Sequence, residues 1–168
     1  LPRKALPGDL LYLAGDRWGR TGAALRAHYE GRSLEGFPKI REAAFYPLPR
    51  LELLALSGLL RGSLDSSDGL AETLWQLSEL GVRVELEVLP LYPDVLAFAG
   101  SEEAALELVL YGGEEFEAVL VVPQEGAAAV EARAKAKGLP LFRVGRVVAG
   151  EGVYLRGAPL PRKGYAHF

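Results

Sequence analysis

Hydrophobic and polar residues follow two different periods along the chain, and these periods predict both strands and helices. Residues 82–88 alternate strictly between apolar and charged side chains, which predicts a strand with its apolar positions, Val88 included, facing a core. Leu70, Leu74 and Leu77 recur at helical spacing among polar residues, which predicts an amphipathic helix with a glycine after its end. The same reasoning predicts further strands over residues 10–14, 118–122, 141–148 and 153–155, and helices over residues 20–29, 51–60, 101–110 and 125–137.

The ends of these segments carry residues that begin or end secondary structure. Ser101 precedes two glutamates and suits a helix N-cap, while Gly138 follows an alanine-rich run and suits the position just after a helix. Residues 150–152, Gly-Glu-Gly, separate the last two predicted strands, which favours a hairpin between them. Residues 31–38 are predicted to be a loop within a longer irregular segment. Helices and strands alternate without a regular strand–helix–strand repeat, so we expect an α+β fold, a mixed sheet with packed helices.

The composition is that of one globular domain. The chain has 168 residues, 49% of them hydrophobic, and a formal net charge of −3, which gives no electrostatic reason to expect nucleic acid as a partner. No apolar run approaches the roughly 18 residues that cross a bilayer, and the first residues lack the pattern of a signal peptide. We therefore expect a cytoplasmic protein with no membrane partner. The absence of cysteine excludes disulfides, thiol nucleophiles and thiolate metal sites.

The most informative local sequence is segment 65–69, Asp-Ser-Ser-Asp-Gly, which places two carboxylates and two hydroxyls just before a predicted helix. Ser67 or Asp68 suits the N-cap of that helix, and Asp65 could simply end a strand. Two carboxylates this close would also crowd negative charge around one helix N-terminus, where the helix dipole offsets only about half a charge. A divalent cation with a phosphate would relieve that repulsion. The residues alone leave both interpretations open, a helix cap and a metal–phosphate site.

The segment 15–21 is a weaker candidate site. It follows a predicted strand and opens a helix, as a phosphate-binding P-loop does, but the spacing is one residue short and Arg20 replaces the lysine. We expect instead a helix N-terminus that packs closely through Gly19 and Gly22, with Arg20 in reach of a phosphate. The two histidines of the chain are far apart and have no cysteine partner, so they do not predict a zinc site.

Three short motifs give the chain a family resemblance. They are the acidic segment 65–69 with the Leu-Ala that follows it, the Gly-Gly-Glu that ends at Glu114, and the Gly-Tyr-Ala-His-Phe that ends at Phe168. Together they resemble the C-terminal half of the thiamine-monophosphate kinases, a family of the aminoimidazole ribonucleotide synthetase superfamily. Residues 16–18 and 115–116 depart from the residues usual in that family. The resemblance covers nearly the whole chain and also includes residues 7–15, 19–25, 144–147 and 150–153.

This resemblance implies an activity and a set of site residues. The activity is ATP-dependent phosphorylation of thiamine monophosphate to thiamine diphosphate, with Mg²⁺ as the cofactor. No side-chain nucleophile is implied, because the acceptor is a phosphate oxygen that is already ionised. The residues that the resemblance assigns are Asp65 and Asp68 to Mg²⁺, Ser67 and Arg3 to ATP, and Glu114 and Phe168 to the thiamine substrate.

The resemblance covers only part of that family's length. Residues 1–168 would form one C-terminal-type domain, and the family's N-terminal domain, which holds most of the magnesium ligands, would lie outside them. We therefore expect this chain alone to be inactive and the full-length protein to be a homodimer. Two alternatives stay open: a superfamily paralogue that acts on another phosphate acceptor, and a non-catalytic nucleotide-binding or regulatory module.

Overall fold

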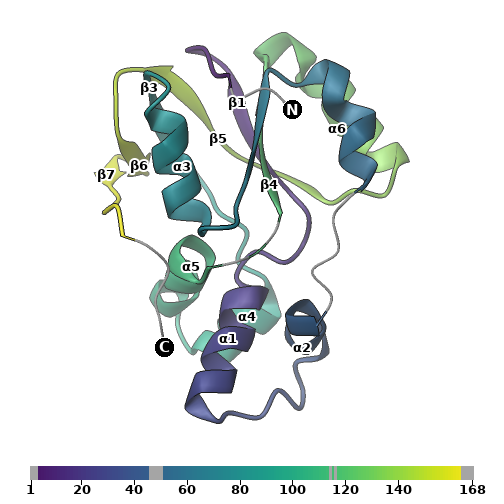
Figure 1. Cartoon of the computed structure of the whole chain (residues 1–168), viewed down its shortest axis with the longest axis vertical. Helices are drawn as coiled ribbons and strands as arrows, with labels where there is room; N and C mark the ends of the chain where they lie inside the picture. The colour runs from purple at the N-terminus through teal and green to yellow at the C-terminus, as the bar shows by residue number, and fades with distance from the viewer. Residues whose placement is uncertain (1–3, 46–50, 114, 116, 164–168) are drawn as a thin grey trace.

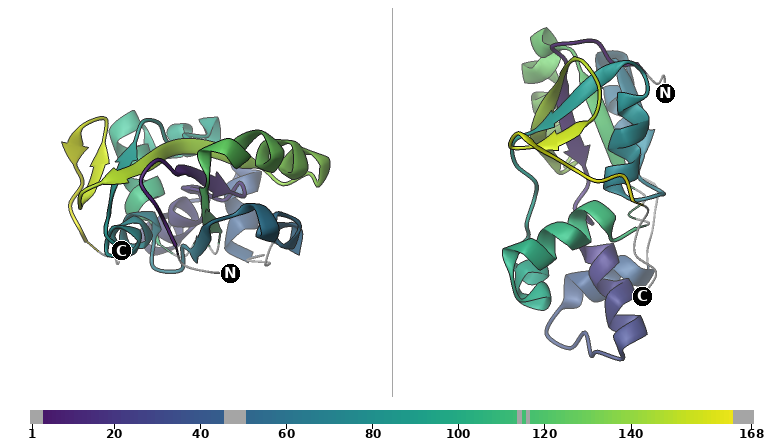
Figure 2. Two further views of the ribbon diagram at one scale, coloured as in Figure 1. Left: turned by 90° about the horizontal axis from the view of Figure 1, so that it is seen from above. Right: turned by 90° about the vertical axis from the view of Figure 1, so that its left-hand side faces the viewer.

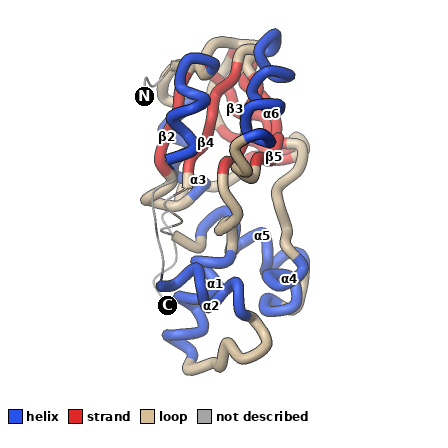
Figure 3. The backbone as a smooth tube through the Cα atoms, turned by 90° about the vertical axis from the view of Figure 1, so that its right-hand side faces the viewer, coloured by secondary structure: helices blue, strands red, loops and turns tan. Residues whose placement is uncertain are grey.

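A seven-stranded mixed sheet and a cluster of four helices form the two ends of the molecule (Figures 1 and 3). The computed structural model describes residues 4–45, 51–113, 115 and 117–163. The second view in Figure 2 shows the two parts one beyond the other along the long axis. The expected α+β class, a mixed sheet with packed helices, is confirmed.

The strand order in the sheet is β2-β4-β1-β5-β3-β6-β7. Strands β3 and β6 are parallel, whereas the other neighbouring pairs are antiparallel. In this strand order, most strands that lie side by side are distant from each other in the sequence. The strands are β1 (Leu10–Ala14), β2 (Gly62–Asp65), β3 (Val82–Leu86), β4 (Ala118–Val122), β5 (Leu141–Ala149), β6 (Val153–Leu155) and β7 (Ala158–Pro159).

Helices cover both faces of the central strands, because these strands are apolar on both sides. In β1, Leu11 packs in the cluster that includes α3 (Leu70–Ser78), whereas Tyr12 packs in the cluster that includes α6 (Ala127–Ala136) and the 3₁₀ helix η1 (Leu51–Leu59). Strand β4 is buried at every position, as expected for a strand between two helical layers. Helices α3 and α6 can be followed on either side of β4 in Figure 1.

The helical cluster at the other end depends on close backbone contact. A Cβ atom built on Gly22 would lie 2.8 Å from the Cα atom of Gly112, and one built on Gly19 would lie 2.9 Å from Cγ2 of Val109. The predicted close packing through Gly19 and Gly22 is therefore confirmed. Within the described part of the chain, no helix is long and apolar enough to cross a bilayer. The helices of the cluster are α1 (Arg20–Glu30), α2 (Pro38–Phe45), α4 (Pro93–Ala99) and α5 (Glu102–Tyr111).

Several local predictions are confirmed. Strand β4 has the predicted bounds. The hydroxyl of Ser101 accepts a hydrogen bond of 3.1 Å from the backbone N–H of Ala104, so Ser101 caps α5. Gly138 has a φ of 68°, the left-handed conformation that commonly follows a helix. The helix predicted over 125–137 is present, although its start is the short 3₁₀ helix η2 (Gln124–Gly126).

Other predictions are wrong. The hairpin around residues 150–152 does not form, because β3 lies between β5 and β6 and pairs with both. Val88 is 41% exposed rather than in the core, since β3 ends at Leu86. Helices α2 and α4 lie in segments for which no helix was predicted, and residues 51–59 form a 3₁₀ helix.

Candidate functional site

The acidic segment 65–69 forms a tight turn after β2, and buried contacts fix its backbone. Asp65 is the last residue of β2 and pairs with the first residue of β4. Ser66 is fully buried, and both its backbone N–H and its hydroxyl donate to the carbonyl oxygen of Glu117, each at 3.0 Å. The backbone N–H of Gly69 donates to the carbonyl oxygen of Ser66 at 3.1 Å and closes the turn.

The side chains of Asp65, Ser67 and Asp68 are available to a ligand. All three residues are exposed, and no hydrogen bond or ion pair joins their side chains to another described residue. The prediction that Ser67 or Asp68 caps α3 is wrong: the N-cap is Gly69, with φ 92° and ψ 155°, and no side chain caps the helix. This backbone conformation is nearly restricted to glycine. The hydroxyl of Thr73 donates to the carbonyl oxygen of Gly69 at 2.8 Å and steadies the helix start.

Glu115 and Glu117 connect the acidic turn to the loop that follows β1. Glu117 Oε2 accepts a hydrogen bond of 3.1 Å from the backbone N–H of Arg17. The same carboxylate lies directly over Gly15. The guanidinium of Arg17 donates to the carbonyl oxygen of Glu115 at 3.4 Å. Because the last residues of β1 and β2 both pair with the first residue of β4, the three connecting segments meet at one end of the sheet.

Glu115 is a fully buried carboxyl in this junction. Neither of its carboxyl oxygen atoms has a hydrogen-bond partner among the described residues. Burial raises the pKa of Glu115 well above its ordinary value; the nearby backbone N–H of Gly19, which does not reach the geometry of a hydrogen bond, opposes the rise, and the negative charge of Glu117 adds to it. The fold therefore favours the neutral carboxylic acid, which keeps one negative charge away from the end of the sheet that carries the acidic turn.

The start of α1 does not have the arrangement of a P-loop. Arg20 is buried, and its guanidinium donates to Oδ2 of Asp94 at 3.0 Å and to the carbonyl oxygen of Asp16 at 2.7 Å. Its Cζ atom lies 4.1 Å from the ring centroid of Tyr92. From the sequence, Arg20 was considered as a contact for a phosphate. In the structure, its contacts give it a structural role, because they join the start of α1 to α4.

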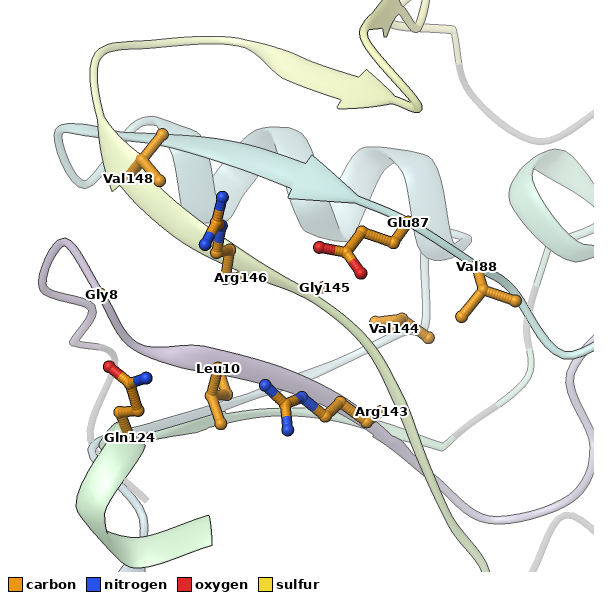
Figure 4. A pocket seen from close by; sticks show the side chains of 10 residues that line it. All are labelled: Gly8, Leu10, Glu87, Val88, Gln124, Arg143, Val144, Gly145, Arg146 and Val148. Atoms are coloured by element: carbon orange, nitrogen blue, oxygen red, sulfur yellow. The ribbon is translucent and has the colours of Figure 1, made fainter.

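A cavity of about 280 Å³ lies elsewhere on the sheet (Figure 4). It is bounded by the start of β1 and the first residue of η2, whereas the acidic turn lies at the start of β4, so the two sites are at opposite ends of these strands. Figure 4 shows the guanidinium groups of Arg143 and Arg146 extending in different directions, so they do not converge on one ligand. The lining residues are Gly8, Leu10, Glu87, Val88, Gln124, Arg143, Val144, Gly145, Arg146 and Val148.

The structure brings together half of the site residues that the sequence suggested. Asp65, Ser67 and Asp68 share one turn. In the described part of the chain, no group of three or more histidine, cysteine, aspartate or glutamate residues could hold a metal ion. The other three suggested residues, Arg3, Glu114 and Phe168, lie outside the described residues.

Sequence reasoning missed the residues that support the acidic turn. Ser66 was one of two neighbouring serines, and nothing local distinguishes the buried one from the exposed Ser67. The contact of Glu117 with the loop at Gly15 joins residues about a hundred positions apart. Gly15, which directly follows the apolar strand β1, was the one available signal in the sequence. Its φ is 98°, a conformation that residues other than glycine disfavour.

Comparisons with known proteins agree with this arrangement. A family model described as "AIR synthase related protein, C-terminal domain" matches residues 7–158. The thiamine-monophosphate kinase of Pyrococcus horikoshii is 31% identical over 160 residues, which cover 93% of this chain and 48% of that protein.

Two solved structures extend the comparison. The crystal structure of tt0281 from Thermus thermophilus is 96% identical, with a TM-score of 0.95 over 96% of this chain and 53% of that chain. The structure of AaThiL complexed with AMPPCP and TMP is 25% identical, with a TM-score of 0.81 over 100% of this chain and 54% of that chain. This chain thus spans about half the length of the relatives it matches. Because this family model matches residues 7–158, the chain belongs to the family described as "AIR synthase related protein, C-terminal domain".

Proposed function

We propose that this chain is the C-terminal domain of an ATP-dependent thiamine-monophosphate kinase, which forms thiamine diphosphate. The observation that carries the proposal is the acidic turn, where Asp65, Ser67 and Asp68 expose oxygen atoms on a backbone held by buried contacts. The similarity to proteins named thiamine-monophosphate kinase supports the same activity for the full-length protein.

The chemistry of this transfer suits such a turn. Phosphoryl transfer depends on positioning and charge neutralisation more than on a side-chain nucleophile. The acceptor is a phosphate oxygen that is already ionised near neutral pH, so the protein does not need a strong base. Its task is to bring two anions together. A Mg²⁺ ion held by Asp65 and Asp68 would supply the required charge neutralisation.

The donor atoms of the turn fit magnesium. Mg²⁺ is a hard cation that proteins commonly bind through one or two carboxylates together with phosphate oxygens and waters. Asp65 and Asp68 provide two carboxylates that form no hydrogen bond or ion pair with another described residue, and Ser67 provides a hydroxyl between them. We therefore assign Asp65 and Asp68 to Mg²⁺, and Ser67 to ATP, with Arg3 as a second ATP contact.

The thiamine substrate is assigned to Glu114 and Phe168. Glu114 follows Gly112 and Gly113, and Gly113 has a φ of 95°, which lets the backbone approach a ligand closely. Phe168 offers a flat apolar face that can stack on the cationic heteroaromatic ring of thiamine.

The remaining parts of the active site belong to the rest of the full-length protein. Because this chain spans about half the length of its relatives, we propose that further magnesium and nucleotide ligands lie on an N-terminal domain outside residues 1–168. The full-length protein is proposed to be a cytoplasmic homodimer.

Asp65→Asn in the full-length protein tests this function. The substitution replaces a metal-binding carboxylate with a neutral amide, so turnover should fall by about 100-fold or more across a magnesium titration. Thiamine diphosphate is the measured product, and thermal denaturation checks that the fold is retained. Glu125→Gln, which removes an exposed carboxylate beyond the other end of β4, is the matched control and should keep its activity.

Three results would contradict the proposal. Near-wild-type turnover of Asp65→Asn at low magnesium would contradict the metal assignment. Turnover with another phosphate acceptor but not with thiamine monophosphate would favour a superfamily paralogue. ATP binding by the full-length protein without any phosphoryl transfer would favour a non-catalytic nucleotide-binding module.

A further inference from the structure

Two buried hydroxyl groups, those of Ser66 and Thr73, bind the backbone of the acidic turn. The exposed fractions of the two residues are 0% and 1%, whereas Asp65 and Asp68 are exposed. A buried hydroxyl that loses its hydrogen bond is not compensated by water, so leaving either group without its partner costs free energy. Each hydroxyl therefore fixes the part of the backbone to which it donates.

Ser66 attaches the start of the turn to the neighbouring chain. Its backbone N–H donates to the carbonyl oxygen of Glu117, which extends by one step the pairing of β2 with β4 that can be followed in Figure 3. Any residue other than proline could form this bond. The hydroxyl adds a second donor to the same oxygen atom, at 3.0 Å. The side chain of Ser66 thus fixes the direction in which the chain leaves β2.

Thr73 joins the two ends of the turn. Its hydroxyl donates to the carbonyl oxygen of Gly69 at 2.8 Å, and the same hydroxyl lies 3.3 Å from the carbonyl oxygen of Asp65. The first contact, with a carbonyl four residues earlier, is common for threonine in a helix. The second contact reaches across the whole acidic turn. One buried side chain thereby holds the last residue of β2 close to the N-cap of α3.

These contacts set the separation between the two aspartates. Asp65 lies before Ser66, and Asp68 lies between Ser66 and Gly69, the two residues whose backbone hydrogen bond closes the turn. The relative position of the two carboxylates therefore depends on the conformation at Ser66. Mg²⁺ requires nearly ideal octahedral geometry with oxygen atoms at about 2.0–2.1 Å, and its ligands must be held to within about 0.5 Å. Its affinity is accordingly sensitive to small shifts of this backbone.

We propose that Ser66 and Thr73 are positioning residues that hold the carboxylates of Asp65 and Asp68 at the separation that Mg²⁺ requires. This inference rests on the proposed function, because that function assigns both aspartates to the metal. Neither hydroxyl touches the metal in this role, since each is buried and donates to a backbone carbonyl oxygen. Their contacts instead reduce the conformational freedom that the turn must lose when its ligand binds.

Ser66→Ala and Thr73→Val in the full-length protein test the inference. Calorimetry measures the dissociation constant for Mg²⁺ in the presence of a non-hydrolysable ATP analogue, so the readout does not depend on turnover. This constant should rise about three- to tenfold in each variant, as expected from the loss of one buried hydrogen bond. The KM for thiamine monophosphate at saturating magnesium should change less than about twofold. Thr73→Ser keeps the hydroxyl and should bind Mg²⁺ as the wild type does.

Ser78→Ala is the matched control. Ser78 is also buried, and it lies at the other end of α3, where its hydroxyl accepts a hydrogen bond of 2.8 Å from the backbone N–H of Gly152. The control therefore removes a similar hydrogen bond without touching the acidic turn. It should lower the midpoint of thermal denaturation as the test variants do, but leave the dissociation constant for Mg²⁺ unchanged. Thermal denaturation also shows whether each variant folds, and either test variant alone decides the outcome.

Asp65→Asn separates failure of this inference from failure of the proposed function. If Asp65→Asn weakens Mg²⁺ binding but Ser66→Ala and Thr73→Val do not, the metal assignment stands and the positioning role is wrong. An equal loss of Mg²⁺ affinity in Ser78→Ala would also overturn the positioning role, because a general loss of stability would then explain all three variants. If Asp65→Asn itself leaves Mg²⁺ binding unchanged, both the metal assignment and the positioning role are wrong.

Discussion

The carboxylate of Glu117 occupies the space that a side chain on Gly15 would need: a Cβ atom built there would lie 1.8 Å from Glu117 Oε2. The same oxygen accepts the backbone N–H of Arg17. Since the carbonyl oxygen of Glu117 also binds Ser66, this single residue joins the loop after β1 to the acidic turn after β2. The shape of the acidic turn thus depends on a glycine in a different connecting segment.

Gly15→Ala should destabilise the chain by about 2–4 kcal/mol, because the new methyl group clashes with Glu117 and the φ of 98° is strained for alanine. Urea denaturation of the variant measures the loss. Adding Glu117→Ala removes the clash but keeps the backbone strain, so the second substitution should cost less in the Gly15→Ala background than in the wild type. Strictly additive losses would contradict the contact described between these two residues.

Gly22→Ala should destabilise the helical cluster by about 1–3 kcal/mol, since the added Cβ atom would meet the backbone of Gly112 and the two helices would have to separate. Gly58→Ala is the control, because no atom lies within 4 Å of the Cβ position there and the residue has no positive φ. The control should be neutral or slightly stabilising. Equal midpoints for both variants in thermal denaturation would show that the contact between Gly22 and Gly112 does not set the distance between α1 and α5.

Glu115→Gln should make the stability of the chain less dependent on pH. In the unfolded chain Glu115 ionises near its ordinary pKa of 4.5, whereas in the folded chain its pKa is raised. As pH rises above 4.5, the unfolded state loses this proton first, so the stability of the wild type falls until the folded pKa is passed. Glutamine keeps the shape of the neutral acid and cannot ionise.

The measurement for Glu115→Gln is the free energy of unfolding from about pH 4 to about pH 8. As the pH rises, the free energy of unfolding of the variant should increase relative to that of the wild type by up to about 1.4 kcal/mol per pH unit. Glu125→Gln, at an exposed position, should follow the pH dependence of the wild type. A constant difference between Glu115→Gln and the wild type at all pH values would mean that folding does not raise the pKa of Glu115.

The isolated chain of residues 1–168 should unfold cooperatively and form no detectable thiamine diphosphate. Its sheet and helical cluster have buried cores, but within the described residues no group of three or more candidate ligands could hold a metal ion. Calorimetry should find only weak binding of magnesium with ATP, on the order of millimolar. Magnesium-dependent turnover by the isolated chain, free of contaminating kinase, would contradict the proposed division of the active site between two domains.

Elements with a local cause were predictable from the sequence. Strand β4 is a short apolar run, the start of α5 has a serine cap, and the end of α6 has a glycine after it; each of these features acts within a few residues. The partner of β6 was not predictable in this way. A glycine-rich connection favours a hairpin, but β3 pairs with β6 across about seventy residues of sequence, as the backbone N–H of Val84 does with Gly152.

In the candidate site, too, some features could be predicted from the local sequence and others could not. The acidic segment was recognisable because its residue types and spacing are unusual before a helix. Its cap was not, since Gly69 takes a conformation that depends on the contacts of Ser66 and Thr73. The buried state of Glu115 was equally hidden, because a run of acidic and aromatic residues after two glycines gives no sign of which side chain points inward.

The acidic turn separates two kinds of evolutionary constraint within one short segment. Ser66 and Gly69 are bound to the scaffold, so selection for folding acts on them. The exposed side chains of Asp65, Ser67 and Asp68 form no hydrogen bond or ion pair with another described residue, so selection for the ligand can change them with little effect on the scaffold. A descendant of this domain could therefore exchange the charge of its turn while inheriting the same backbone, and a new specificity would not require a new fold.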